Sequence, residues 1–116
     1  MWSGPRNVST AMMYSWRQRT DTTVIDEPMY GHYLVVTGLD HPDRDRILAT
    51  VPTDADDIIT KMLEPDCPTP VRFYKNMAHH LVGFDPAAFD ELASFLLVRD
   101  PRDMLPSLAK SLGRPP

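Results

Sequence analysis

The segment Trp2-Ser3-Gly4-Pro5-Arg6-Asn7-Val8-Ser9-Thr10 has residue types that bind an anion at the start of a helix. It places one permanent cation, Arg6, and two adjacent hydroxyls, Ser9 and Thr10, in a turn-forming stretch. Apolar residues at helical spacing follow and predict a helix over Ser9 to Arg19. The first amides of a helix lack backbone partners, and the helix dipole adds about half a positive charge there. We therefore predict a phosphate or sulfate site, although a capped helix with a surface arginine also fits these residues.

A second anion-binding signal lies near the end of the sequence, at Arg99 and Ser107. Arg99 ends a largely apolar run, Ser94 to Arg99, which predicts a strand. Ser107 follows eight residues later in a predicted helix, about two helical turns on. If that helix runs back along the sheet, the hydroxyl comes near the guanidinium and the two bind a second phosphate. The alternative is a strand-end arginine that pairs with a nearby aspartate, Asp100 or Asp103.

Other reactive side chains follow two further predicted strands. Asp26 and Glu27 come after a β-branched run, and Lys75 ends a second alternating run. Both acids also fit a structural role, as loop caps or ion-pair partners of arginines, with Asp26 pairing with Arg6. His79, His80 and His32 are each most simply packed or surface residues. They stand at no zinc-like spacing, so we predict no metal.

The predicted elements alternate between helix and strand. Strands are predicted at Thr22 to Asp26, Val71 to Lys75 and Ser94 to Arg99. Helices are predicted at Ser9 to Arg19 with Ser9 or Asn7 as N-cap, at 44–50, from Thr53 as cap through Leu63, from Asp85 or Pro86 to Leu92, and at Pro101 to Leu112. This order predicts an α/β fold, a three-layer sandwich around a parallel sheet. Ligands bind at the carboxyl ends of such strands, where the polar clusters fall.

Composition excludes several classes of protein. The chain has 116 residues and a net charge of −4, so we expect a single domain, residues 1–116, that does not bind nucleic acid. It has no run of 18 apolar residues and no signal-peptide pattern, so we expect neither membrane insertion nor secretion. The single cysteine, Cys67, excludes an intrachain disulfide and suits a cytoplasmic location.

The beginning and end of the sequence are abrupt. Only Met1 and Trp2 precede the predicted anion loop, where a buried strand is expected. We therefore expect this chain to be the N-terminal fragment of a longer, incomplete domain. The alternative is a compact small protein with a short first strand.

The two anion signals resemble the cofactor motifs of sulfotransferases that depend on 3′-phosphoadenylyl sulfate (PAPS), a family with a P-loop-NTPase-like fold. Arg6-Asn7-Val8-Ser9-Thr10 stands where that family has its 5′-phosphosulfate loop, and Arg99 and Ser107 match its 3′-phosphate motif. The stretches Asp26-Glu27-Pro28 and Lys75-Asn76-Met77-Ala78-His79-His80 are similar to a sulfotransferase-like branch of the family. Val8 replaces a glycine of the common motif.

This resemblance implies a transferase that moves a sulfonate group from PAPS to a hydroxyl of a small-molecule acceptor, without a metal. Arg6, Asn7, Val8, Ser9 and Thr10 would hold the 5′ end, and Arg99 and Ser107 the 3′-phosphate. Glu27 would be the general base, which Asp26 would orient. Lys75 would assist the leaving phosphate, and His79 or His32 would be an alternative base.

Two other functions are compatible with the sequence. One is a phosphoryl-transfer P-loop enzyme of the kinase type, although the sequence lacks Gly-x-x-x-x-Gly-Lys-[Ser/Thr]. The other is a truncated, non-catalytic nucleotide-binding fragment. The sequence indicates neither the acceptor nor the oligomeric state.

Overall fold

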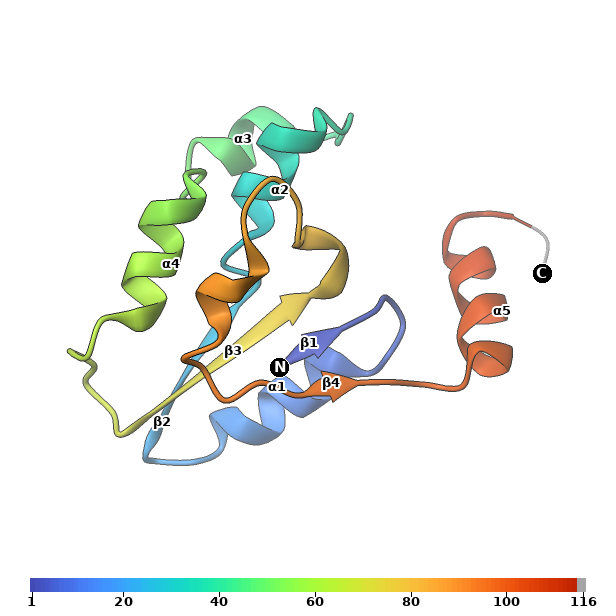
Figure 1. Cartoon of the computed structure of the whole chain (residues 1–116). Helices are drawn as coiled ribbons and strands as arrows, with labels where there is room; N and C mark the ends of the chain where they lie inside the picture. Colours follow the sequence, from blue (N-terminus) through green and yellow to red (C-terminus); the bar gives the residue numbers. More distant parts are fainter. Residues whose placement is uncertain (115–116) are drawn as a thin grey trace.

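A four-stranded parallel sheet organises the computed structural model, which describes residues 1–114 (Figure 1). The strands lie in the order β2 (Thr22–Asp26), β3 (Val71–Met77), β1 (Trp2–Ser3) and β4 (Leu96–Leu97). Every neighbouring pair is parallel. The predicted α/β class with a parallel sheet is therefore confirmed, and β1 adds a fourth strand to the three that the sequence indicates.

Helices connect the strands in chain order. They are α1 (Ser9–Arg17), α2 (Tyr30–Thr37), α3 (Arg44–Leu48), α4 (Ala55–Leu63), two short 3₁₀ turns η1 (Ala78–His80) and η2 (Pro86–Phe89), and α5 (Pro101–Ser111). The aromatic-rich segment before Gly38, which the sequence leaves ambiguous, forms α2. Gly31 is required there, because a Cβ at this position would lie 2.2 Å from the carbonyl oxygen of Pro52.

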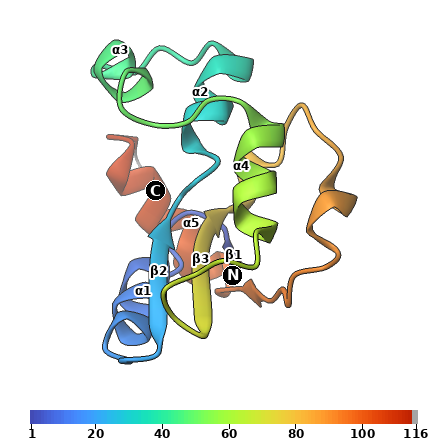
Figure 2. The ribbon, with the colours of Figure 1, turned by 90° about the vertical axis from the view of Figure 1, so that its left-hand side faces the viewer.

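The sheet separates two apolar clusters and so forms the middle of three layers. On one face Met1 and Phe73 pack against Met13 of α1. On the other face Trp2 packs with Phe89 and with the apolar side of α4. Figure 2 shows α1 on one side of β2 and β3 and α4 on the other. The alternation of Met1 and Trp2 between the two clusters follows from the period of two in a strand.

Several predicted boundaries are wrong. The helix predicted from Asp85 or Pro86 to Leu92 is only the 3₁₀ turn η2, Pro86–Phe89, and two other differences have clear local reasons. Asp54, and not Thr53, caps α4, because its carboxylate accepts a hydrogen bond from the backbone N–H of Asp57 at 3.0 Å. The last strand, predicted over Ser94 to Arg99, is only Leu96–Leu97. It lies at the sheet edge beside the two-residue strand β1, which offers no more backbone to pair with.

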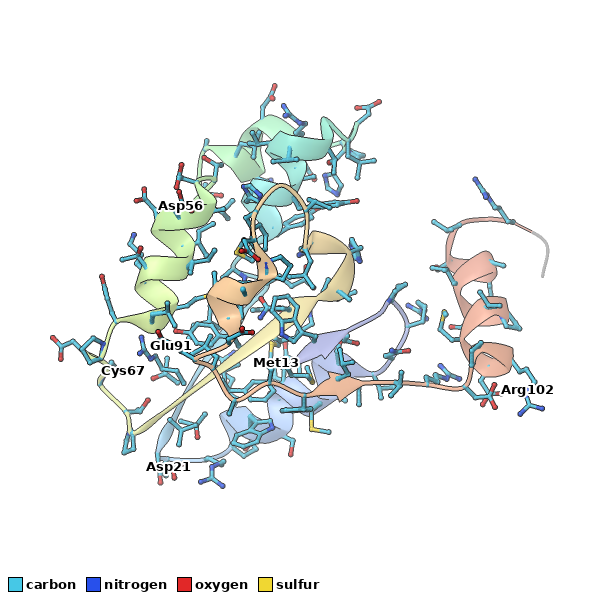
Figure 3. All side chains as sticks on the ribbon, viewed as in Figure 1. Met13, Asp21, Asp56, Cys67, Glu91 and Arg102 are labelled. Carbon is cyan, nitrogen blue, oxygen red and sulfur yellow. The ribbon has the colours of Figure 1, made fainter. Side chains whose placement is uncertain are left out.

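The helix α5 stands to one side of the sheet, beyond the end of β4 (Figure 1). Asp100 caps its first turn by accepting a hydrogen bond from the N–H of Arg102 at 2.8 Å. Figure 3 shows Arg102 at this end of α5, far from Asp21 beside β2. No helix within residues 1–114 is long and apolar enough to cross a membrane.

Candidate active site

The loop between β1 and α1 has the backbone of an anion cradle. Arg6 and Val8 both adopt left-handed conformations, with φ of 62° and 53°. Val8 precedes the right-handed residues of α1, and such a left-to-right alternation turns successive amides toward one point. No side chain within residues 1–114 caps α1. The first amides of the helix are therefore available to an external anion.

The predicted helix cap at this loop is wrong, for a tertiary reason. The side-chain amide of Asn7 donates a hydrogen bond to the carbonyl oxygen of Leu97 at 2.9 Å and does not reach α1. Ser9 is buried as the first helical residue, and Thr10 is exposed. Asn7 thus ties the loop to the end of β4, the strand that leads to Arg99.

The two anion signals lie side by side. Arg6 Nε donates a hydrogen bond to Ser107 Oγ at 3.1 Å, and Arg99 Nη1 donates to the carbonyl oxygen of Arg6 at 3.1 Å. Arg6 and Arg99 are exposed at this place, and Ser107 is half-buried. Arg99 does not pair with Asp100, which binds Arg102 instead at 2.9 Å. Two guanidinium groups and one hydroxyl therefore gather at the carboxyl ends of β1 and β4.

A buried lysine gathers the carboxylates at the end of β2. Lys75 is aligned with Asp26 in the β2–β3 pairing. Its Nζ donates to Asp26 Oδ1 at 2.8 Å and to Glu27 Oε1. Burial disfavours the charged amine, but the hydrogen bonds and charges of both carboxylates outweigh burial and raise the pKa of Lys75. Asp26 thus pairs with Lys75, and the alternative in which it pairs with Arg6 is wrong.

Glu27 is held in a fixed and unusual conformation. Its φ is 46°, in the left-handed region, and its N–H donates to the carbonyl oxygen of Lys75 at 2.8 Å. Its side chain is 28% exposed, so it is accessible from solvent although one oxygen contacts the lysine. Non-glycine residues in this region carry strain, and such strain gathers at functional sites.

The candidate histidines differ in their surroundings. His79 is exposed beside Tyr33, with ring centroids 5.2 Å apart. His80 is buried against Tyr30 and Tyr33, and burial, with smaller contributions from His79 and Lys75, lowers its pKa to about 4. It is therefore neutral near pH 7.

His32 lies between two backbone carbonyls and has a structural position. Its Nδ1 is 3.3 Å from the oxygen of Thr53 and its Nε2 is 2.8 Å from that of Val82. Both ring nitrogens thus face backbone carbonyls of the protein itself, so neither is presented to a substrate.

The sequence did not indicate the aromatic cluster around His80 or the buried polar residues near the loop. Ser3 and Asn76 are almost fully buried at the ends of β1 and β3. A polar residue within an apolar strand could have indicated them in the sequence, because a buried polar side chain needs a hydrogen-bond partner. Among residues 1–114, no group of three acidic, histidine or cysteine side chains could hold a metal ion.

A cavity of about 500 Å³ opens beside the carboxylates, between β2, α4 and the loop after α4. Asp26 and Glu27 line it, together with Ile25, Ile58 and Met62. Another cavity, of about 530 Å³, is lined by Met1, Val71 and Phe95, among others, and by none of the predicted site residues. The smaller cavity is therefore the one associated with the candidate chemistry.

Comparison with known proteins adds an independent finding. A family model described as a sulfotransferase domain matches residues 1–111. The Branched-chain-amino-acid aminotransferase-like proteins 1 and 2 of Arabidopsis thaliana are 34% and 36% identical to this chain over 110 residues, which is 94% of this chain. The chain spans about a fifth of the length of these curated relatives, since the match covers 20% of each. No solved structure matches.

Proposed function

The chain belongs to the sulfotransferase domain family, and we propose that it binds PAPS and transfers the sulfonate group to the hydroxyl of a small-molecule acceptor. When bound, PAPS would supply an activated sulfonate, whose sulfur gains a bond to the acceptor oxygen as its bond to the phosphate breaks. This proposal also covers a cytoplasmic location, which suits the free thiol of Cys67.

One observation supports the proposal most strongly: Arg6 contacts Ser107 while Arg99 contacts the backbone of Arg6. Since the chain carries a net charge of −4, an anionic nucleotide has to be held by local cations. Guanidinium groups match phosphate oxygens in geometry and stay charged at any relevant pH. Arg99 and Ser107 would bind the 3′-phosphate at this place.

The loop residues fit the other end of the nucleotide. Arg6 and Val8 have left-handed backbones, a conformation that favours amides converging on one point, and no side chain of the described residues caps α1. This donor set suits the 5′-phosphosulfate, because amides and a helix N-terminus bind oxyanions without needing a basic surface. Asn7, Ser9 and Thr10 would complete this set.

Glu27 is the proposed general base. Its Oε1 contacts Lys75, and Oε2 makes no hydrogen bond within residues 1–114, which leaves it able to accept the acceptor's hydroxyl proton. Lys75 would hold Glu27 in position and counter the carboxylate charges near the transferred group. Glu27 and the anion loop follow strands two positions apart in the sheet, about 10 Å at the usual strand spacing. His79, exposed nearby, is the alternative base.

The test is calorimetric titration of the protein with adenosine 3′,5′-bisphosphate, the desulfated product. We expect saturable binding that is at least about tenfold weaker for Arg99→Ala, because a charged hydrogen bond is lost. Arg102→Ala, three residues further along the chain, is the matched control, since Arg102 is 90% exposed and pairs with Asp100. Adenosine 5′-monophosphate, which lacks the 3′-phosphate, should bind more weakly to the unaltered protein. No saturable heat at millimolar ligand would overturn the proposal.

A further inference from the structure

The cavity beside Glu27 has a definite chemical character. Its walls are largely apolar, formed by Ile25, Ile58 and Met62 with prolines from the flanking loops. Its volume, about 500 Å³, lies in the range of small-molecule sites. The two carboxylates at its edge face it from the end of β2, while Lys75 lies outside the lining.

The charge of the lining is unbalanced. Four carboxylates line the cavity, from Asp26, Glu27, Glu64 and Asp66, against two cations, Lys61 and Arg72. Arg72 is already engaged, because its guanidinium donates to the backbone oxygens of Lys61 and Glu64. Lys75, just outside the lining, contacts two of these carboxylates, so four carboxylates face three cations and one negative charge remains in excess. An anionic guest would therefore meet a lining of net negative charge.

We infer that this cavity is the acceptor site and that it takes an alcohol or phenol with an apolar skeleton and no negative charge. The inference rests on the proposed function and specifies its substrate class. The skeleton lies against Ile58 and Met62, and the hydroxyl reaches Glu27. In the transfer the acceptor oxygen would form a bond to the sulfur of PAPS, and the bond from sulfur to the 5′-phosphate oxygen would break. Adenosine 3′,5′-bisphosphate would leave with that electron pair, and the hydroxyl proton would pass to Glu27. Acceptors that carry carboxylate or sulfate groups are repelled by the lining.

Cys67 offers a direct probe of occupancy. It is the chain's only cysteine, lies half-buried on the loop below α4, and lines the same cavity (Figure 3). Hydrogen bonding to the backbone of Thr69 lowers the pKa of its thiol, which favours the reactive thiolate. A molecule in the cavity should therefore slow alkylation of Cys67.

The experiment measures the rate of Cys67 alkylation by N-ethylmaleimide, by mass spectrometry, with two matched sets of ligands. One set is 4-ethylphenol, tyramine and 3-(4-hydroxyphenyl)propanoate, and the other is 1-hexanol, 6-aminohexanol and 6-hydroxyhexanoate. We expect the neutral and cationic members of at least one set to slow alkylation threefold or more, and the carboxylates to have no effect. Adenosine 3′,5′-bisphosphate alone should not protect Cys67.

A second measurement separates occupancy from folding. Protein alkylated at Cys67 should lose sulfonate transfer to the protecting alcohol at least tenfold and still bind adenosine 3′,5′-bisphosphate normally. Cys67→Ser is the control, because the reagent should leave its transfer rate equal to the rate of the same variant before treatment. Protection by the carboxylates, or by none of the six ligands while the nucleotide still binds, would overturn the acceptor assignment alone. Loss of nucleotide binding in the unaltered protein would instead overturn the proposed function.

Discussion

Arg6 Nε and Ser107 Oγ lie 3.1 Å apart, although 101 residues separate them in the chain. This hydrogen bond joins the loop after β1 to α5, a helix that has no buried residue of its own. A second hydrogen bond, from Arg99 just before α5 to the carbonyl oxygen of Arg6, joins the same two parts of the chain. The position of α5 therefore depends on the same polar groups that we assign to the nucleotide.

Ser107→Ala tests this shared role. The variant removes the hydroxyl, so we expect binding of adenosine 3′,5′-bisphosphate to weaken about 5- to 10-fold, the usual effect of one hydrogen bond. Its stability should change by less than about 0.5 kcal/mol, because the contact is exposed. Ser111→Ala is the control, since Ser111 Oγ donates a hydrogen bond to the carbonyl oxygen of Leu108 on the same helix. Calorimetry measures the affinity of both variants for the nucleotide. Equal affinities would show that Ser107 does not contact the nucleotide.

Glu27→Gln tests the proposed base. The amide keeps the shape of the side chain and cannot accept the proton, so kcat should fall about 10²- to 10⁴-fold. Affinity for adenosine 3′,5′-bisphosphate should stay within threefold, because Glu27 follows β2, two strands away from the anion loop after β1. Asp26→Asn, which alters the neighbouring carboxylate on the same lysine, should lower kcat much less. A Glu27→Gln enzyme with near-normal kcat would point to His79 instead, and His79→Gln would then be the variant to measure.

Local patterns predicted much of the fold. The strand Thr22–Asp26 was predicted with its observed limits, because its β-branched run is bounded by polar residues. Helix α1 begins at Ser9 as predicted, yet its cap was wrong because Asn7 bonds to Leu97, 90 residues away. The gathering of Arg6 and Arg99 followed from the parallel sheet, whose carboxyl ends share an edge.

The cavity could not be predicted from the sequence. Its lining comes from β2, α4, β3 and the loops around them, and no single stretch of sequence carries its pattern. Lys75 shows the same limit. Its alignment with Asp26 depends on the register between two strands nearly 50 residues apart, which no local motif fixes.

Lys75→Met should destabilise the protein. The change leaves two adjacent carboxylates without their cation, and we expect the free energy of unfolding to fall by about 2 kcal/mol, less than for fully buried pairs because both carboxylates are partly exposed. Lys110→Met on α5 is the control. Since the pKa of Lys75 is raised above 10.5, its contribution is fully present below that pH and is lost as pH rises through the folded-state pKa. Urea unfolding at pH 7.5 measures both variants, and equal midpoints would contradict the prediction.

His80 should make stability depend on pH in acid. Its pKa is about 4 in the folded protein and 6.5 ordinarily, so the unfolded chain binds more protons between these values. The free energy of unfolding should therefore fall as pH falls from 6.5 to 4, by up to about 3 kcal/mol. His80→Phe keeps an aromatic ring beside Tyr30 and Tyr33 but has no group that titrates. The free energy of unfolding of this variant should therefore depend less on pH between 4 and 6.5, even if the variant is less stable at every pH. His41→Gln is the control. The prediction is wrong if the free energy of unfolding of His80→Phe depends on pH as strongly as that of the unaltered protein.

Val8→Gly tests whether the left-handed backbone at residue 8 is strained. A β-branched residue with φ of 53° is unfavourable by about 1–2 kcal/mol, whereas glycine adopts this conformation freely. Glycine also gives the unfolded chain more conformational freedom, which offsets part of the gain. We expect the free energy of unfolding to stay unchanged or to rise by up to about 1 kcal/mol, since Val8 is 67% exposed and buries little surface.

The control for Val8→Gly makes the conformational argument specific. Val35→Gly replaces an exposed valine inside α2, where φ is helical, and should cost about 0.5–1 kcal/mol. Adenosine 3′,5′-bisphosphate should bind Val8→Gly at least as tightly as the unaltered protein, because the loop's amides keep their arrangement. Thermal and urea unfolding compare the two variants. A loss of stability in Val8→Gly equal to that in Val35→Gly would show that the left-handed backbone at Val8 carries no strain.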